Sequence, residues 1–200
     1  MFADLWVTFQ KGGYVMYPIL ACSVFSVALA AERFLFYNHC DTEDSFVSRL
    51  GAMLQTSEKE TAEKAGNVEG DCARLTEYYL FHKEAGMTGV ETQANIMLDS
   101  YNDHLVFLSM IVTISPLLGL LGTIIGMINS FKVFDLRAGQ PFAITAGIGE
   151  ALIATAFGLI VAILAMVLYG ALKYRSSVLG KKIMKCCTAL ELHANGGETR

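Results

Sequence analysis

Three runs of this sequence carry almost no charge, and they constrain the fold more than any other feature. Residues 105–131 contain no charged side chain, and Glu150 is the only charged residue in 138–172. Residues 12–31 form a third uncharged run. A helix that spans a bilayer needs about 20 apolar residues. Because each run reaches that length, the sequence predicts an all-α integral membrane protein with three transmembrane helices.

The composition argues against several other classes. The chain is 54% hydrophobic with a net charge of −4 and no long basic run, which disfavours nucleic-acid binding. Its four histidines are scattered and its five cysteines lack zinc-ligand spacing, so no metal or other cofactor is expected. The glycine-rich stretch GLLGTIIG lacks the lysine of a phosphate-binding loop. No enzyme motif is found, and the cysteines are expected to be free thiols.

The runs divide the chain into seven segments. An apolar stripe that includes Trp6 predicts an interfacial amphipathic helix, with Trp6 as its membrane anchor. The predicted segments are the interfacial helix 1–11, the first span 12–31, a polar helical domain 32–104, the second span 105–131, a short link 132–143, the third span 144–172, and a helix and tail 173–200.

Lysine and arginine indicate the orientation, because they accumulate on the cytoplasmic side of membrane proteins. The amino-terminal segment holds only Lys11, and the link holds only Lys132 and Arg137. The polar domain and the tail hold the other lysines and arginines. The sequence therefore predicts an external amino terminus, with the domain and the tail in the cytoplasm.

Small residues recur at helical spacing in the second and third spans. Such a stripe lets another helix approach closely, and we expect a homo-oligomer packed through these two spans. Proline lacks a backbone N–H, so a proline in the second span interrupts its hydrogen-bond ladder. The predicted helix-packing residues are Pro116, Gly119, Gly122, Gly126, Gly147, Ala154 and Gly158.

Three polar side chains in the spans are candidates for function. A charge deep in a span costs roughly 2.5–3.5 kcal/mol on insertion scales, which suggests that Glu150 faces protein or water. It could fix the assembly by hydrogen bonding, or it could line a proton path. Thr123 and Thr155 could bond their own helix backbone, as threonines in spans usually do, or form polar rings around a pore.

Three stretches together resemble a known family. They are GGYVMYPIL followed by Glu32-Arg33, then SPLLGLLGTIIGMINSF, then GIGEALIATAFGLIVAI. They resemble the ExbB/TolQ branch of the MotA/TolQ/ExbB proton channel family across all three spans and the polar domain. The resemblance maps the polar pore positions of that family onto Thr123, Thr155 and Glu150.

The resemblance implies a subunit of a motor in the bacterial inner membrane, driven by the proton motive force. Such subunits have long cytoplasmic helical extensions and assemble as a ring-shaped oligomer, a pentamer. The ring surrounds two copies of a single-span ExbD/TolR-like partner and works with a TonB/TolA-like protein. The moving proton would be carried mainly by an Asp of the partner helix, with Glu150 tuning the local field.

Two features limit the resemblance. The chain is short for a flagellar MotA, and Leu164 stands where ExbB proteins often have proline. The first-span pattern favours an ExbB-like protein of TonB-dependent uptake. The alternatives are a TolQ-type envelope-maintenance subunit and a non-conducting membrane scaffold. A solute transporter is a weaker reading, because the chain has three spans and no internal repeat.

Overall fold

The structure is a computed structural model that describes residues 9, 12–136 and 141–198, without the side chains of 133–136, 141–146 and 197–198. Within these residues the regular elements are helices and no strand occurs, which confirms the predicted all-α class. The chain divides into two compact units. We call them the membrane unit (Met1–Ala31 and His104–Gly170) and the polar unit (Glu32–Asp103 and Ala171–Arg200). Trp6 and the rest of the predicted interfacial helix 1–11, except Phe9, lie outside the described residues.

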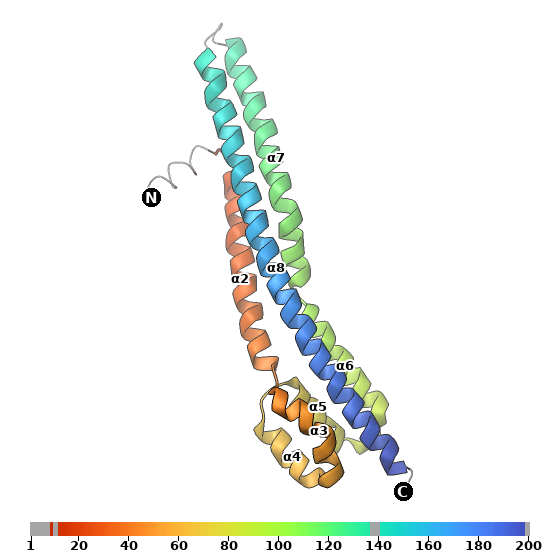
Figure 1. Cartoon of the computed structure of the whole chain (residues 1–200). Helices are drawn as coiled ribbons and strands as arrows, with labels where there is room; N and C mark the ends of the chain where they lie inside the picture. The colour runs from red at the N-terminus through yellow and green to blue at the C-terminus, as the bar shows by residue number, and fades with distance from the viewer. Residues whose placement is uncertain (1–8, 10–11, 137–140, 199–200) are drawn as a thin grey trace. The chain divides into compact units, whose positions relative to one another are not determined.

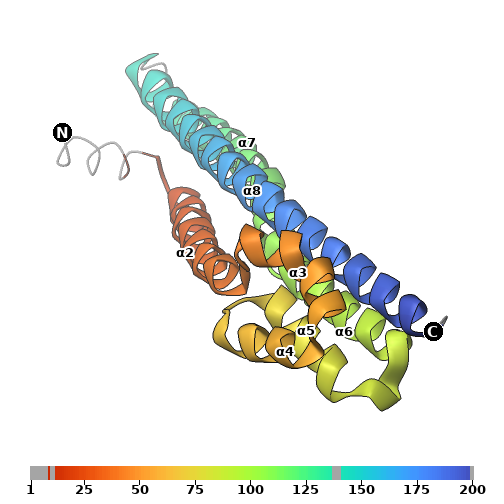
Figure 2. The same ribbon diagram turned by 60° about the horizontal axis from the view of Figure 1, so that its bottom comes forward.

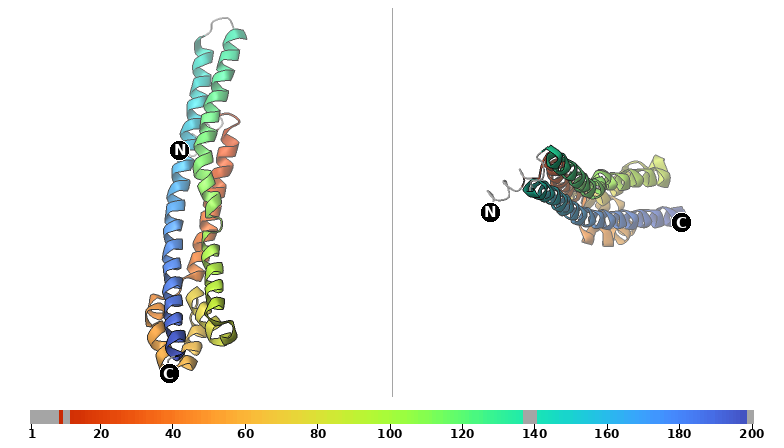
Figure 3. Two further views of the ribbon diagram at one scale, coloured as in Figure 1. Left: turned by 90° about the vertical axis from the view of Figure 1, so that its right-hand side faces the viewer. Right: turned by 90° about the horizontal axis from the view of Figure 1, so that it is seen from above.

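Three long helices supply the membrane unit: α2 (Met16–Cys40), α7 (Leu105–Leu136) and α8 (Pro141–Glu198). In the part of the chain that the structure describes, three helices are long and apolar enough to cross a membrane. Figures 1 and 3 show the membrane-unit portions of α7 and α8 lying side by side along their length. They are antiparallel, since the chain turns back between them.

The link between these two helices is shorter than the predicted 132–143. Helix α7 continues to Leu136 and α8 begins at Pro141, so at most residues 137–140 connect them, and these lie outside the described residues. Proline at the first position of α8 is favourable, because the first helical N–H has no partner in the helix and the ring fixes φ near its helical value. The predicted start of the third span at residue 144 therefore falls inside α8.

A tight turn precedes α2. Gly13 has a φ of 71°, in the left-handed region that glycine occupies without steric cost. The backbone N–H of Met16 donates to the carbonyl of Gly13 at 3.2 Å, which starts the helix. Pro18 lies in the first turn, where a missing N–H removes no helical hydrogen bond.

Short helices build the core of the polar unit (Figure 2). They are α3 (Asp44–Thr56), α4 (Glu58–Asn67), α5 (Asp71–Phe81), the 3-10 helix η1 (Lys83–Ala85) and α6 (Gly86–Asn102). The Ser57 hydroxyl caps α4 by accepting a hydrogen bond from the Glu60 N–H at 3.4 Å. Serine followed three residues later by glutamate is the capping-box pattern, so this helix start is encoded locally.

The second half of α8 also belongs to the polar unit. Leu179, Ile183, Cys186 and Leu190 are buried there, and their spacing of four, three and four residues gives one apolar face of a helix. The tail of α8 is therefore part of the core of the polar unit.

Candidate functional site

Helices α7 and α8 cross at backbone contact in the membrane unit. A Cβ atom added to Gly158 would lie 2.7 Å from the Ser115 carbonyl oxygen and 2.9 Å from the Cα of Gly119. These distances leave no room for a side chain, so glycine at 158 is what permits the crossing. Pro116 lies in the same turn of α7.

The small residues continue this contact toward the end of α7. A Cβ on Gly122 would lie 2.6 Å from the Ala154 methyl, and one on Gly126 would lie 2.8 Å from that of Ala151. A Cβ on Gly147 would collide with the Ser130 hydroxyl. The glycine stripe therefore meets the chain's own α8. Within one chain α8 already occupies this stripe, and the expectation that these two spans also pack one copy against another stays a prediction.

Both threonines direct their hydroxyl groups at the backbone of α7. The Thr155 hydroxyl, which extends from α8, donates to the Gly119 carbonyl at 2.9 Å. The Thr123 hydroxyl donates to the Leu120 carbonyl at 2.6 Å. The two hydroxyls are therefore held at adjacent carbonyls of one α7 turn. Because each hydrogen is used by a carbonyl, the remaining lone pairs can only accept hydrogen bonds.

Ser115 adds a buried hydroxyl at the same crossing. Its side chain is buried, and within the described residues its oxygen has no hydrogen-bond partner. A buried hydroxyl without a partner costs about 1–3 kcal/mol on the basis of protein mutational data. The α7–α8 crossing thus combines close packing with polar groups that are not fully satisfied.

Glu150 lies at a different place, against the turn that precedes α2. Its Oε1 occupies the space that a Cβ on Gly13 would take, so glycine at 13 permits both the turn and the approach of the carboxylate. Glu150 also lines a cavity of about 280 Å³ with Asn129 and the start of α2. Neither Thr123 nor Thr155 lines this cavity. The three polar residues predicted for one pore thus form two separate sets.

The sequence pattern did not single out Gly13 or Asn129 as functional. Asn129 is a polar side chain in an uncharged run, and Gly12-Gly13 marks a turn; both signals are visible in the sequence. Their proximity to Glu150 could not be read from it, because they lie on three separate segments.

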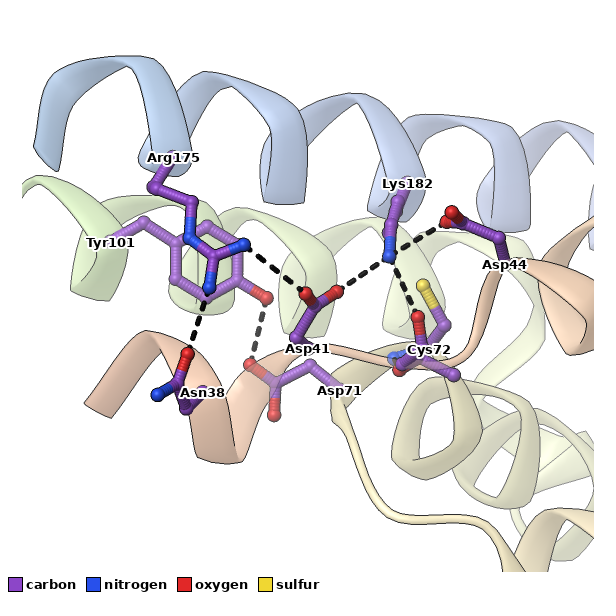
Figure 4. A network of polar contacts seen from close by, with 9 residues as sticks. Asn38, Asp41, Asp44, Asp71, Cys72, Tyr101, Arg175 and Lys182 are labelled. Carbon is purple, nitrogen blue, oxygen red and sulfur yellow. Dashed lines mark hydrogen bonds and ion pairs between the residues drawn. The ribbon is translucent and has the colours of Figure 1, made fainter. Parts of the chain in front are cut away.

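A second set of polar contacts stabilises the polar unit (Figure 4). Lys182 of α8 pairs with Asp41 at 2.5 Å and with Asp44 at 2.7 Å, and it donates to the Thr42 carbonyl at 2.8 Å. Two turns earlier on α8, Arg175 donates to Asn38 at 2.8 Å. The basic tail is therefore fastened to the acidic segment around Asp41.

Buried hydroxyl groups extend this network inward. Tyr37 donates to the Tyr101 carbonyl at 2.7 Å, and the Tyr101 hydroxyl donates to the buried carboxylate of Asp71 at 2.7 Å. Burial, together with the Asp71 hydrogen bond, raises the pKa of Tyr101 well above its ordinary value, so it remains a donor. The network gives Asp71 a strong partner in an interior where an unpartnered carboxylate would be costly.

The cysteines within the described residues are free thiols. Burial, reinforced by Asp71, raises the pKa of Cys40 to about 12. A hydrogen bond with Cys72 and burial likewise raise the pKa of Cys186. Since the thiolate is the reactive form, these thiols are poor nucleophiles at neutral pH. Among the described residues no group of three or more His, Cys, Asp or Glu could hold a metal ion.

Three apolar spanning helices and a polar helical unit define this chain as a multi-span helical membrane protein. The sequence profile of the MotA/TolQ/ExbB proton channel family matches residues 81–185. The chain belongs to this family. The matched region includes the whole α7–α8 crossing, both threonines and Glu150, as well as Lys182.

Individual relatives fall in the ExbB/TolQ branch. The biopolymer transport protein ExbB-like 1 of Synechocystis is 33% identical over 171 residues, covering 80% of this chain and 67% of that protein. The biopolymer transport protein exbB1 of Vibrio cholerae is 32% identical over 166 residues, covering 77% and 72%. The Tol-Pal system protein TolQ of Pseudomonas aeruginosa is 35% identical over 101 residues, covering 48% and 44%.

Proposed function

We propose that this chain is the proton-conducting stator subunit of an inner-membrane motor, which couples the proton motive force to an envelope process such as TonB-dependent uptake. The observation that carries the proposal is the pair of threonine hydroxyls, one from α7 and one from α8, that donate to neighbouring carbonyls on one turn of α7. Each hydroxyl is fixed by donating to a carbonyl, at 2.9 Å for Thr155 and 2.6 Å for Thr123. Their remaining lone pairs are suited to accept a hydrogen bond from a protonated acid or from hydronium.

A conducting path also needs a group that carries the proton past this turn. Both threonines already donate to backbone, so they are poor carriers themselves. An Asp on an ExbD/TolR-like single-span partner would supply the carrier, with the threonines accepting its hydrogen bond in the protonated state. We infer a pentameric ring of this chain around two partner helices, with a TonB/TolA-like protein receiving the motion. In this assembly the amino terminus is periplasmic and the carboxyl terminus is cytoplasmic.

A proton that crosses 100 mV releases roughly 2.3 kcal/mol. Several crossings would supply enough free energy to move one set of helices against a load. The tight α7–α8 crossing supports this role, because a pore wall that is held by backbone contact can transmit force without separating.

A TolQ-type envelope-maintenance subunit is the second candidate, supported by the relative from Pseudomonas aeruginosa. The two candidates share the conduction step and differ in the process that is driven. Cells that depend on this chain would distinguish them: growth on siderophore-bound iron reports TonB-dependent uptake, and resistance to detergent reports envelope maintenance.

Proton uptake by liposomes tests the proposal directly. The chain is reconstituted alone and with an ExbD-like partner, a membrane potential is imposed, and internal pH is followed. We expect uptake only with the partner. A non-conducting scaffold predicts the same background rate in both preparations, and that result would reject the proposal.

A further inference from the structure

A cavity in the membrane unit lies where α2 begins, apart from the turn of α7 that holds the threonine hydroxyls. Its volume is about 280 Å³, near the lower end of the range for small-molecule sites, about 300–1,000 Å³. The turn before α2, helix α7 and helix α8 line it, whereas Thr123 and Thr155 do not. A cavity of this size suits the polar headgroup of a larger molecule.

The uncharged runs place this cavity at the depth of lipid headgroups. The run 12–31 has the length that a span needs, about 20 residues, so the turn at Gly13 marks one end of that span. The Glu150 carboxylate lies against Gly13 and therefore at the same depth. Residues 151–172 of α8 are uncharged and reach the length of a span without Glu150. Figure 1 agrees with this depth, because the α7–α8 pair extends beyond the start of α2.

Among the described residues that line the cavity, Glu150 carries the one formal charge. Within the described residues it forms neither an ion pair nor a hydrogen bond with a protein donor. The start of α2 stabilises the carboxylate from one side, because the amino-terminal end of a helix favours negative charge. The carboxylate also lines the cavity, so a cation held there would pair with it.

The rings of Phe9, Tyr14 and Tyr17 line the same cavity. Phe9 and Tyr17 meet edge to face, with ring centroids 5.7 Å apart. Tyr14 and Tyr17 are exposed, so their rings are not used to fill the interior of the membrane unit. The face of an aromatic ring attracts a cation, and rings of this kind bind ammonium groups in proteins. A carboxylate beside three aromatic rings therefore indicates a site for an ammonium group.

The polar atoms of the walls favour a primary ammonium over a quaternary one. A primary ammonium has three N–H donors. The Glu150 carboxylate, the Asn129 carboxamide oxygen and the tyrosine hydroxyls can each accept one of these hydrogen bonds. A quaternary ammonium has no N–H to donate, and the Glu150 carboxylate repels an anionic headgroup.

We propose that this cavity binds the primary ammonium headgroup of a membrane lipid of the phosphatidylethanolamine type. The ammonium pairs with Glu150 and packs against the aromatic rings, while the acyl chains stay in the bilayer. The depth of the cavity favours a lipid, because the bilayer supplies headgroups at that level. The site goes beyond the proposed proton conduction, since lipid binding requires neither the partner nor a membrane potential.

Native mass spectrometry of the full chain in detergent tests the site. The chain receives equal concentrations of phosphatidylethanolamine, phosphatidylcholine and phosphatidylglycerol with the same acyl chains, and the retained lipids are counted. We expect phosphatidylethanolamine to be retained at least about tenfold more than either of the others, the factor for one hydrogen bond to a charged group. Equal retention of the three lipids would overturn the proposal.

Two pairs of variants test the residues of the site. Glu150→Gln keeps the size of the side chain but removes its charge, and it should abolish the preference for phosphatidylethanolamine. Its control, Glu69→Gln, removes the same charge from an exposed position of the polar unit and should keep the preference. A preference that persists in Glu150→Gln would contradict the site.

The second pair decides the matter even if Glu150→Gln does not fold. Tyr17→Leu should lower the retention of phosphatidylethanolamine roughly two- to fivefold, the size of one cation–π contact. Phe25→Leu, at an exposed aromatic residue of α2 that does not line the cavity, should leave it unchanged. Equal retention by these two variants would also count against the site.

A soluble amine is the other source of the same chemistry. Glycerophosphoethanolamine carries the headgroup without acyl chains, and at equal concentration it should displace little of the bound lipid, because acyl chains strengthen association with an apolar phase. Full displacement would assign the cavity to a soluble amine and overturn the lipid assignment. A chain that retains the lipid but does not conduct protons would reject the proposed function alone.

Discussion

At the scale of single residues, the crossing of α7 and α8 depends on the absence of side chains. Gly158 faces backbone atoms, the Ser115 carbonyl oxygen and the Gly119 Cα, which cannot move aside as a flexible side chain can. Gly122 faces the methyl group of Ala154. Substitutions at 158 and 122 should therefore act first on the fold of one chain, before any effect on assembly.

We predict that Gly158→Ala destabilises the membrane unit by about 1–3 kcal/mol, as overpacking of a tight interface does. The matched control is Gly170→Ala on the same helix, where an added Cβ meets nothing within 4 Å. That control should be neutral or more stable by up to ~1 kcal/mol, because alanine favours helix. Unfolding in mixed micelles, followed by circular dichroism, measures both variants, and equal stability would contradict the observed crossing.

The sequence predicted which glycines make the close helix contact, but it predicted little of what surrounds Glu150. Glycines at three- and four-residue spacing reveal a close helix contact, since that spacing places them on one face. They do not reveal that the neighbouring helix belongs to the same chain. Grouping Glu150 with the threonines failed to anticipate the cavity, because the position of the Gly13 turn depends on the tertiary fold.

At the scale of elements, the tail of α8 is held by both apolar and charged contacts. The apolar face continues through Leu179 to Leu190, and Lys182 is placed beside that face, where it contacts the segment between α2 and α3. Burial lowers the pKa of Lys182, but hydrogen bonds to Asp41 and Asp44 outweigh it and raise the pKa overall. The Lys182 hydrogen bond in turn lowers the pKa of Asp44.

We predict that Lys182→Met destabilises the polar unit by about 1.5–3 kcal/mol, the range for hydrogen bonds to charged groups. Lys181→Met is the control, since Lys181 is exposed on the same helix turn and forms none of these contacts. Urea unfolding of the full chain in micelles measures the difference. Equal midpoints for the two variants would show that the charged contacts add nothing to the apolar face.

The contacts of Lys182 with Asp41 and Asp44 also determine how the stability of the polar unit depends on pH. A raised lysine pKa gives stability that is fully present below the unfolded value of about 10.4 and is lost as pH rises through the folded value. A lowered aspartate pKa gives stability that is present above the unfolded value of about 3.9 and is lost as pH falls. The stability difference between Lys182→Met and the unsubstituted chain should therefore be largest between these values and shrink outside them.

The element boundaries show where sequence reasoning stops. The start of α4 was encoded locally by Ser57 and Glu60, and the loss of charge located the spans. The length of the link was overestimated, because Lys132 marks a change in polarity and a helix can continue past such a change. Helix α7 does so, extending four residues beyond it to Leu136.

At the scale of the whole molecule, the all-helical class and the family could be inferred from sequence. The three uncharged runs indicated the helical class, since a membrane strongly restricts the structures that can cross it. The motifs around Gly122 and Glu150 indicated the family. The oligomer and the partner protein remain proposals. Both depend on contacts with other chains, and the sequence of one chain does not show which chain covers a given surface.

The proposed orientation makes a prediction of its own. In a cysteine-free variant, Lys132→Cys at the end of α7 should react with an impermeant thiol reagent added to intact cells, and Lys185→Cys in the tail should not. Both positions are exposed, so access depends on the side of the membrane. Labelling at position 185 alone would reverse the orientation inferred from the Lys and Arg distribution.

The hydroxyl of Thr155 offers the most direct test of proton conduction. Thr155→Val keeps the shape of the side chain but removes the donor to Gly119 and the acceptor lone pairs, whereas Thr155→Ser keeps both. Proton uptake is measured in liposomes that contain the partner, with complex formation checked in parallel. We predict that Thr155→Val assembles but conducts at least about tenfold more slowly, consistent with the loss of one hydrogen bond worth roughly 1.4 kcal/mol, while Thr155→Ser retains most of the flux. Unchanged uptake by an assembled Thr155→Val complex would contradict the assignment of this turn to the proton path.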